Sequence, residues 1–100
     1  MKFHEKVLIM LEKIPSGKVT SYKIIAEKLG TRAYRAVGTA VKNNPNAPVV
    51  PCHRVVKSDG RIGSYSGRGG VKTKIKLLEK EGIEISDGRI VDFEKVLFRF

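Results

Sequence analysis

The chain has a single cysteine, Cys52, among its 100 residues, and this limits how the fold can be held together. No internal disulfide is possible, so an apolar core must stabilise what the length predicts to be one domain, residues 1–100. A lone cysteine also indicates a reducing compartment. The sequence carries neither a membrane-length apolar run nor a signal-peptide pattern, so we expect a cytoplasmic protein with no membrane partner.

The charge balance is strongly basic. Lys and Arg number 20 and Asp and Glu number 10, which gives a formal net charge of +10. Such an excess favours a nucleic acid or another anionic surface as the partner. The alternative is a solvated, lysine-rich surface, which is common in stable proteins.

The first half of the chain predicts three helices. Apolar residues at helical spacing predict a helix over residues 3–13, a second over 21–29 and a third over 32–42. Gly30, between the last two, suits the left-handed conformation that ends a helix. The pair forms a helix-turn-helix pattern over about residues 21–42, although helical hairpins also occur in ordinary cores.

The ends and the outer face of these helices carry polar side chains. We expect Thr20 or Ser21 to cap the second helix and Thr31 to cap the third. Side chains suited to phosphate contacts would line the outer face and ends of the third helix: Arg32, Tyr34, Arg35, Lys42 and Asn43.

The second half of the chain mixes short strands with one more helix. The expected elements are a strand (53–57), a hairpin turn (58–60), a returning strand (61–62), a glycine-rich loop (63–70), a helix (71–81) and a small hairpin with a tail (83–100). The predicted fold class is α+β: a small, mainly helical DNA-binding domain with a helix-turn-helix and short β-hairpins.

Cys52 lies in the segment Pro51-Cys52-His53-Arg54-Val55, where a proline interrupts apolar residues. A thiolate is a strong nucleophile, and a neighbouring base increases its abundance. His53 is adjacent, but neighbours on a strand point to opposite faces, so a bridging water or a bend at Pro51 would be needed. The alternative is an inert buried thiol. We expect no zinc site, since Cys52, His53 and the distant His4 supply too few ligands.

Two further features could serve a site. Tyr65 and Ser66 offer hydrogen-bonding groups within the glycine-rich loop, which lacks the Gly-Lys-Ser/Thr of a phosphate-binding loop and could also be an ordinary surface loop. Glu81 stands at the end of the helix over residues 71–81, where a carboxylate opposes the helix dipole. It is either a solvated charge or the third member of a Cys–His–carboxylate relay.

Several of these segments together resemble the O6-alkylguanine-DNA alkyltransferases. The segment around Cys52 is similar to the active-site motif of that family, and order and spacing agree from about Phe3 to Gly82. The other similar segments are Ile14-Pro15-x-Gly17-x-Val19-Thr20-Ser21-Tyr22, Arg35-Ala36-Val37-Gly38, Asn44-Pro45, Tyr65-Ser66-Gly67 and Lys72 through Leu77-Leu78-x-x-Glu81-Gly82.

The resemblance implies DNA repair by direct damage reversal. A flipped O6-alkylguanine in duplex DNA would give its alkyl group irreversibly to Cys52, so each protein molecule, a monomer without a cofactor, would react once. His53 would deprotonate Cys52 through a water, Glu81 would orient His53, and Asn44 would hold the turn that shapes the site.

The resemblance also implies how the DNA is held. Contacts to the extruded guanine would come from Tyr22, Ser66, Tyr65 and the backbone of Val50. Arg35 would fill the gap left by the flipped base, with the helix-turn-helix in the minor groove. The other implied DNA contacts are Ala36, Gly38, Thr20, Ser21, Lys42 and Arg54.

The chain also departs from the family, and two other functions stay open. Many members carry an additional N-terminal domain, so we expect a minimal version or an excised domain; Arg68 stands where a second glycine often follows, and the tail after Gly82 lies outside the match. A non-catalytic alkyltransferase-like damage-binding protein is one alternative, although such proteins usually replace the cysteine, commonly with Trp, which this chain lacks. A helix-turn-helix transcription factor would leave Cys52, His53 and Glu81 unexplained.

Overall fold

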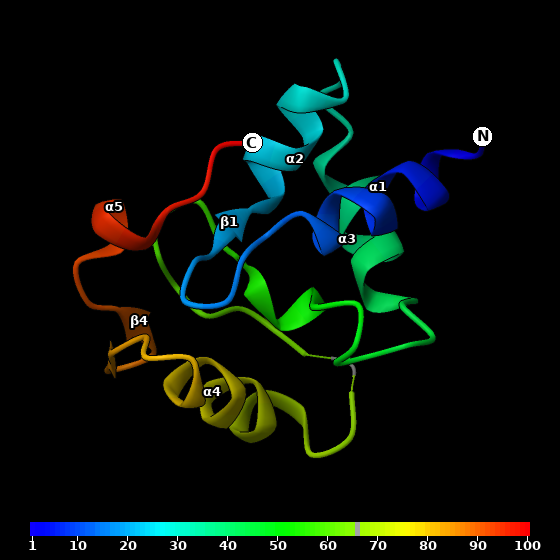
Figure 1. The fold of residues 1–100 in the computed structure, drawn as a ribbon. Helices are drawn as coiled ribbons and strands as arrows, with labels where there is room; N and C mark the ends of the chain where they lie inside the picture. Colours follow the sequence, from blue (N-terminus) through cyan, green and yellow to red (C-terminus); the bar gives the residue numbers. More distant parts are fainter. Residues whose placement is uncertain (66) are drawn as a thin grey trace.

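The structure is a computed structural model that describes residues 1–65 and 67–100. The fold is α+β, as the sequence predicts, and the helices dominate (Figure 1). In chain order its elements are α1 (Phe3–Glu12), β1 (Thr20–Ser21), α2 (Tyr22–Lys28), α3 (Tyr34–Lys42), the 3₁₀ turn η1 (Cys52–Arg54), β2 (Val55–Val56), α4 (Gly70–Lys80), β3 (Ile85–Ser86), β4 (Arg89–Ile90) and α5 (Phe93–Val96). No helix in this part of the chain is long and apolar enough to cross a membrane.

The helix-turn-helix forms from α2 and α3, and α3 packs against both α1 and α2. Ser21 caps α2 as predicted, since its Oγ accepts a hydrogen bond of 3.1 Å from the backbone N–H of Ile24. Gly30 has the expected positive φ, +73°. The expected start of α3 was wrong by two residues: Thr31 accepts from the N–H of Ala33 and makes a turn before the helix, so α3 begins at Tyr34.

The strand expected over residues 53–57 is reduced to β2, because Cys52–Arg54 form η1. β2 pairs in parallel with β1, with Val55 opposite Thr20. The turn over residues 58–60 does form, closed by a hydrogen bond from the N–H of Lys57 to the carbonyl of Arg61. The returning segment makes its bridge to Arg89 of β4 and not to β2, so the expected first hairpin was wrong.

The C-terminal segment makes the small hairpin that the sequence predicts, β3 antiparallel to β4. The chain then runs along the free side of β1. The N–H of Val19 donates to the carbonyl of Val96 at 2.9 Å, and the N–H of Phe98 donates to the carbonyl of Val19 at 2.6 Å. Val19, directly before β1, is thus bridged to Leu97, whereas β1 itself pairs with β2.

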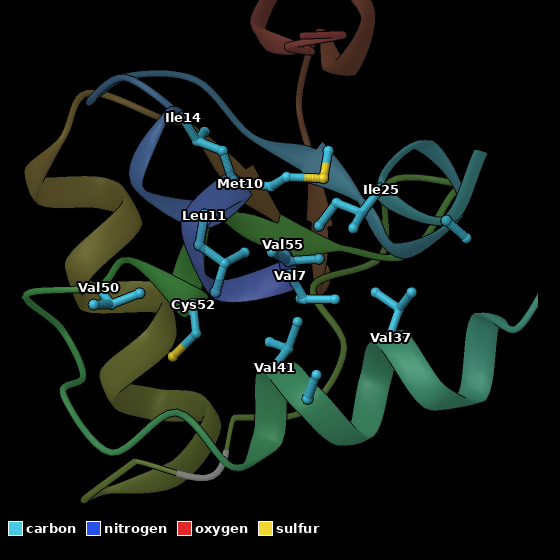
Figure 2. Packing of buried hydrophobic residues seen from close by; sticks show 12 residues of the cluster. Val7, Met10, Leu11, Ile14, Ile25, Val37, Val41, Val50, Cys52 and Val55 are labelled. Atoms are coloured by element: carbon cyan, nitrogen blue, oxygen red, sulfur yellow. The ribbon is translucent and has the colours of Figure 1, made fainter. Parts of the chain in front are cut away.

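Buried apolar side chains form two clusters. The larger one, shown in Figure 2, packs α1 against α2, α3 and the segment that holds Cys52: Val7, Met10, Leu11, Ile14, Ile25, Ala26, Val37, Ala40, Val41, Val50, Cys52 and Val55. The smaller one joins β2, α4 and the C-terminal hairpin: Val19, Val56, Ile62, Leu78, Ile83 and Ile90. Each fully buried Leu, Ile or Val contributes about 1.5–3 kcal/mol by leaving water. The segment from η1 to β2 contributes to both clusters, with Cys52 and Val55 in the larger one and Val56 in the smaller one.

Candidate active site

A small pocket opens beside Cys52. It has a volume of about 180 Å³ and is lined by Tyr22, Gly38, Val41, Lys42, Cys52, Ser64 and Tyr65. Its walls come from α2, α3, η1 and the segment before α4. The volume lies below the ~300–1,000 Å³ typical of pockets for drug-sized ligands. The pocket therefore suits a group about the size of a single base.

Cys52 forms part of the wall of this pocket and is otherwise buried, with 3% of its surface exposed. The loop before it is held by Asn44, whose Nδ2 donates to the carbonyl of Val50 at 2.6 Å and whose Oδ1 accepts from the N–H of Asn46. The N–H of Cys52 donates to the same Val50 carbonyl at 2.8 Å. Asn44 thus fixes the turn that brings the sulfur to the pocket.

His53 follows Cys52 in η1, and its two ring nitrogens have different surroundings. Nε2 is 3.1 Å from Oε2 of Glu81, whereas Nδ1 is buried with no hydrogen-bond partner among the described residues. Burial lowers the pKa of His53, and the hydrogen bond to Glu81 opposes this only in part. The neutral ring therefore places its proton on Nε2, toward the carboxylate, and leaves a lone pair on Nδ1.

Arg54 fixes the carboxylate that His53 uses. Its Nη2 donates to Oε2 of Glu81 at 2.6 Å, its Nε donates to Oε1 at 3.0 Å, and its Nη1 donates to the carbonyl of Ile14 at 2.6 Å. Burial alone raises the pKa of Glu81, but the hydrogen bonds from Arg54 and then His53 outweigh it, so that pKa is lowered. Glu81 is an ionised, doubly held acceptor, and not a solvated charge at the end of a helix.

Lys74 is a buried cation next to the site that the sequence analysis missed. It is fully buried, and its Nζ donates to the carbonyls of Val55 at 2.7 Å and Ser64 at 3.1 Å. Burial lowers its pKa to about 8, while attraction to the nearby Cys52 acts in the opposite direction. Lys74 links the strand after η1 to the segment that lines the pocket, and it places a positive charge near the sulfur.

Two tyrosines complete the pocket. Burial, followed by the charge of Cys52, raises the pKa of Tyr22, and the same two causes raise the pKa of Tyr65. Both hydroxyls keep their protons at neutral pH and can donate hydrogen bonds to a bound group. Ser66, the other predicted contact in this loop, lies outside the described residues.

The predicted DNA-binding residues of α3 lie on the surface. Arg35 and Ala36 are exposed in its first turn, and Arg35, Gly38 and Lys42 line a shallow depression next to the pocket. For three other residues the structure does not support a DNA contact by the side chain. Thr20 and Ser21 are buried in β1, and the guanidinium of Arg54 is turned inward to Glu81 and Ile14.

The sequence did contain a signal for Lys74. It occupies a position of the apolar stripe of α4, four residues before the buried Leu78, where an exposed lysine is not expected. The role of Arg54 had no local signal, because its acceptors Glu81 and Ile14 are distant in sequence. Among the described residues no group of three His, Cys, Asp or Glu side chains gathers to hold a metal ion.

Comparisons with known proteins identify the family of this chain. The family model described as 6-O-methylguanine DNA methyltransferase, DNA binding domain, matches residues 2–83. The methylated-DNA--protein-cysteine methyltransferase of Pyrobaculum aerophilum is 49% identical over 83 residues, which are 83% of this chain and 54% of that relative. The chain thus spans about half the length of the curated relatives it matches.

Two solved structures extend the likeness to three dimensions. Mycobacterium tuberculosis OGT in complex with DNA is 43% identical, with a TM-score of 0.75 over 81% of this chain and 50% of that one. S. pombe Atl1 in complex with damaged DNA containing O6-carboxymethylguanine is 31% identical, with a TM-score of 0.85 over 100% of both chains. Both of these solved structures are complexes with DNA.

Proposed function

Because the chain belongs to the 6-O-methylguanine DNA methyltransferase family, we propose that it repairs duplex DNA by transferring an alkyl group from O6 of guanine to the sulfur of Cys52. The observation that carries the proposal is the buried Cys52 on the wall of a base-sized pocket. His53, hydrogen-bonded to Glu81, follows it in η1, and the cation of Lys74 is nearby. A protein that binds DNA without reacting with it would not need this arrangement.

The transfer balances without a cofactor. The sulfur, as thiolate, attacks the alkyl carbon, an S–C bond forms, and the C–O bond breaks with its electron pair going to the guanine oxygen. The thiol proton is taken up on the protein, and the leaving guanine anion is protonated in turn, so the net change moves one proton from sulfur to guanine. The thioether is stable, so each molecule reacts once.

His53 is the group that we propose accepts the thiol proton. Its Nε2–H points to Glu81, so the lone pair on Nδ1 is the basic site. Nδ1 has no hydrogen-bond partner among the described residues, and in this proposal a bridging water connects it to the sulfur. Tyr22 and Tyr65 keep their protons and would stabilise the developing charge on guanine.

The base must leave the duplex to reach the pocket, because the alkyl carbon is inaccessible inside the stack. We propose that α3 enters the minor groove and that Arg35, exposed at its start, occupies the space left by the base. The partner would be double-stranded DNA containing O6-alkylguanine, bound by a monomer. The reduced thiol that the reaction requires fits the reducing cytoplasm.

A second candidate is lesion binding without transfer. It is favoured by the likeness to Atl1, which spans this chain from end to end and includes the C-terminal segment beyond residue 83. Both candidates predict binding to a duplex that carries the lesion. They differ in whether Cys52 changes mass.

The test is intact-protein mass spectrometry with peptide mapping, after incubation with a duplex containing one O6-methylguanine. We expect one methyl group on the Cys52 peptide, unmodified guanine in the DNA, and no second turnover. Cys52→Ser should bind the duplex and gain no mass, and an undamaged duplex should leave the parent unchanged. Tight lesion binding with no mass change in the parent would replace repair by damage recognition.

A further inference from the structure

Three basic side chains from outside α3 gather on one part of the surface. Lys57 follows β2, Arg61 follows the turn, and Arg89 belongs to β4; together they line a depression of about 530 Å³. We call these three residues the hairpin basic surface. Residue 89 lies beyond the range 2–83 that the family model matches, so this surface combines a matched and an unmatched part of the chain.

Folding alone does not account for this arrangement. Arg61 and Arg89 are opposite each other in an antiparallel bridge, where like charges are unfavourable. Asp59 pairs with Arg61 at 3.2 Å and also accepts from its backbone N–H. Arg89 makes no ion pair within 4 Å among the described residues. The hydrogen bond from the backbone N–H of Arg61 is the main cause that lowers the pKa of Asp59, and the charge of Arg89 contributes only a minor part. Asp87 is the one carboxylate among the residues that line the depression, and Asp59 pairs with Arg61, so the three basic side chains keep a positive excess.

The hairpin basic surface is continuous with the proposed active site. Lys57 and Gly63 line its depression and also a second one, which Arg35 and Lys42 of α3 border. That second depression shares Gly38 and Ser64, among others, with the pocket of Cys52. An anionic chain lying in these hollows would pass from the pocket to β4.

We propose that Lys57, Arg61 and Arg89 bind backbone phosphates of the same duplex that α3 engages. The β3–β4 hairpin then extends the DNA-binding surface beyond the helix-turn-helix. This rests on the proposed function for the identity of the polyanion. The longest dimension of the protein is 36 Å, so a duplex along it presents about ten base pairs at ~3.4 Å each, enough for contacts on both sides of the flipped base. Contacts to phosphates, and not to base edges, would leave binding independent of sequence.

The experiment is a salt series of duplex affinities, measured by fluorescence anisotropy between about 50 and 200 mM salt. Arg89→Gln is compared with Lys80→Gln, which removes an equal charge at the exposed end of α4, outside these depressions. Losing one phosphate contact lowers by about 0.9 the salt slope, the steepness with which the logarithm of the affinity falls with the logarithm of the salt concentration. The ratio of the parent's duplex affinity to that of Arg89→Gln should therefore shrink about 3.5-fold from about 50 to 200 mM salt. The Lys80→Gln slope should match the parent.

Adding Arg61→Gln to Arg89→Gln should lower the slope by about 1.8 in total. An Arg89→Gln slope equal to that of the parent or of Lys80→Gln would overturn the proposal. Thermal melting checks the fold, and removing one of two opposed arginines should not lower the melting temperature.

Failure of this inference is separable from failure of the proposed function. Alkylation of Cys52 by free O6-benzylguanine base, a substrate without phosphates, should be the same in the parent and Arg89→Gln. If the parent repairs DNA but Arg89→Gln shows the same salt dependence of duplex affinity as the parent, phosphate binding by the hairpin basic surface is refuted and the repair function stands. If the slope falls but Cys52 never becomes alkylated, the surface stands and the repair function is wrong.

Discussion

Replacing Arg54 by Met should lower the free energy of unfolding by about 2–4 kcal/mol. The change removes the guanidinium that holds Glu81 through Nε and Nη2 and holds Ile14 through Nη1. The side chains of Arg54 and Glu81 are 17% and 15% exposed, so this is a partly buried pair. Breaking a buried pair by removing one partner costs about 3–5 kcal/mol, and the partial exposure places the expected cost somewhat lower.

Urea denaturation measures this loss. At a slope of about 2 kcal/mol per molar urea, the midpoint should fall by about 1–2 M. The control is Arg99→Met, which removes the same group from an exposed pair with Glu94 at 3.6 Å and should leave the midpoint unchanged. A double-mutant cycle with Glu81→Gln isolates the coupling between Arg54 and Glu81.

The effect should also depend on pH in a defined direction. The pKa of Glu81 is lowered in the folded protein, so the unfolded state binds more protons as the pH falls below the ordinary value of about 4.3. The stabilisation is therefore complete above that pH and is lost as the pH falls through the folded pKa. The gap between the parent and Arg54→Met should narrow in acid.

The salt dependence of DNA binding tests whether the guanidinium of Arg54 acts inside the protein. An inward-facing Arg54 predicts that Arg54→Met, assayed below its melting temperature, binds an undamaged duplex with the salt slope of the parent. Unchanged stability together with a slope lowered by about 0.9 would mean that the guanidinium contacts phosphate instead, and the internal role would be wrong.

Three further results are expected. Burial lowers the pKa of Lys74 to about 8, so between that pH and the ordinary pKa of ~10.4 the unfolded state binds more protons than the folded state. The free energy of unfolding of the parent should therefore rise between about pH 8 and pH 10, and the urea midpoint of Lys74→Met should not show this rise. An equal rise in the variant would contradict the assignment to Lys74. Arg35→Ala should slow alkyl transfer from duplex DNA at least about tenfold, roughly 1.4 kcal/mol of extrusion energy, while changing undamaged-duplex affinity much less; equal single-turnover rates would remove its role in extrusion. Gly67→Ala would place a Cβ against the ring of Tyr65 and should slow alkylation of Cys52 by free O6-benzylguanine, so an unchanged rate would show that the ring moves aside freely.

The helical half of the fold was predictable because its signals are local. The hydroxyl of Ser21 before α2 and the positive φ of Gly30 after it are each decided within a few residues. The prediction that Thr31 caps α3 was wrong because a threonine side chain can close a turn just as well as cap a helix.

The strands were harder to predict because they are short and their partners are distant. β2 has two residues, and its pairing with β1 is settled by packing between the two buried clusters. The chain forms a 3₁₀ turn directly after Pro51, so Cys52 and His53 do not have the alternating directions of neighbours on a strand. The inward course of Arg54 and the burial of Lys74 depend on carbonyls and a carboxylate that only the folded chain brings near.

The hydrogen bonds that join Val19 to Val96 and Phe98 set an order of events for a newly made chain. β1 leads directly into α2, whose first residue, Tyr22, lines the pocket. One side of β1 cannot be completed until residues 96–98 have left the ribosome, since contacts between distant positions form only when both are present. Until then β1 has an open edge that can pair with another chain. During synthesis, the backbone next to Tyr22 and the pocket therefore gains these hydrogen bonds only after residues 96–98 have been made.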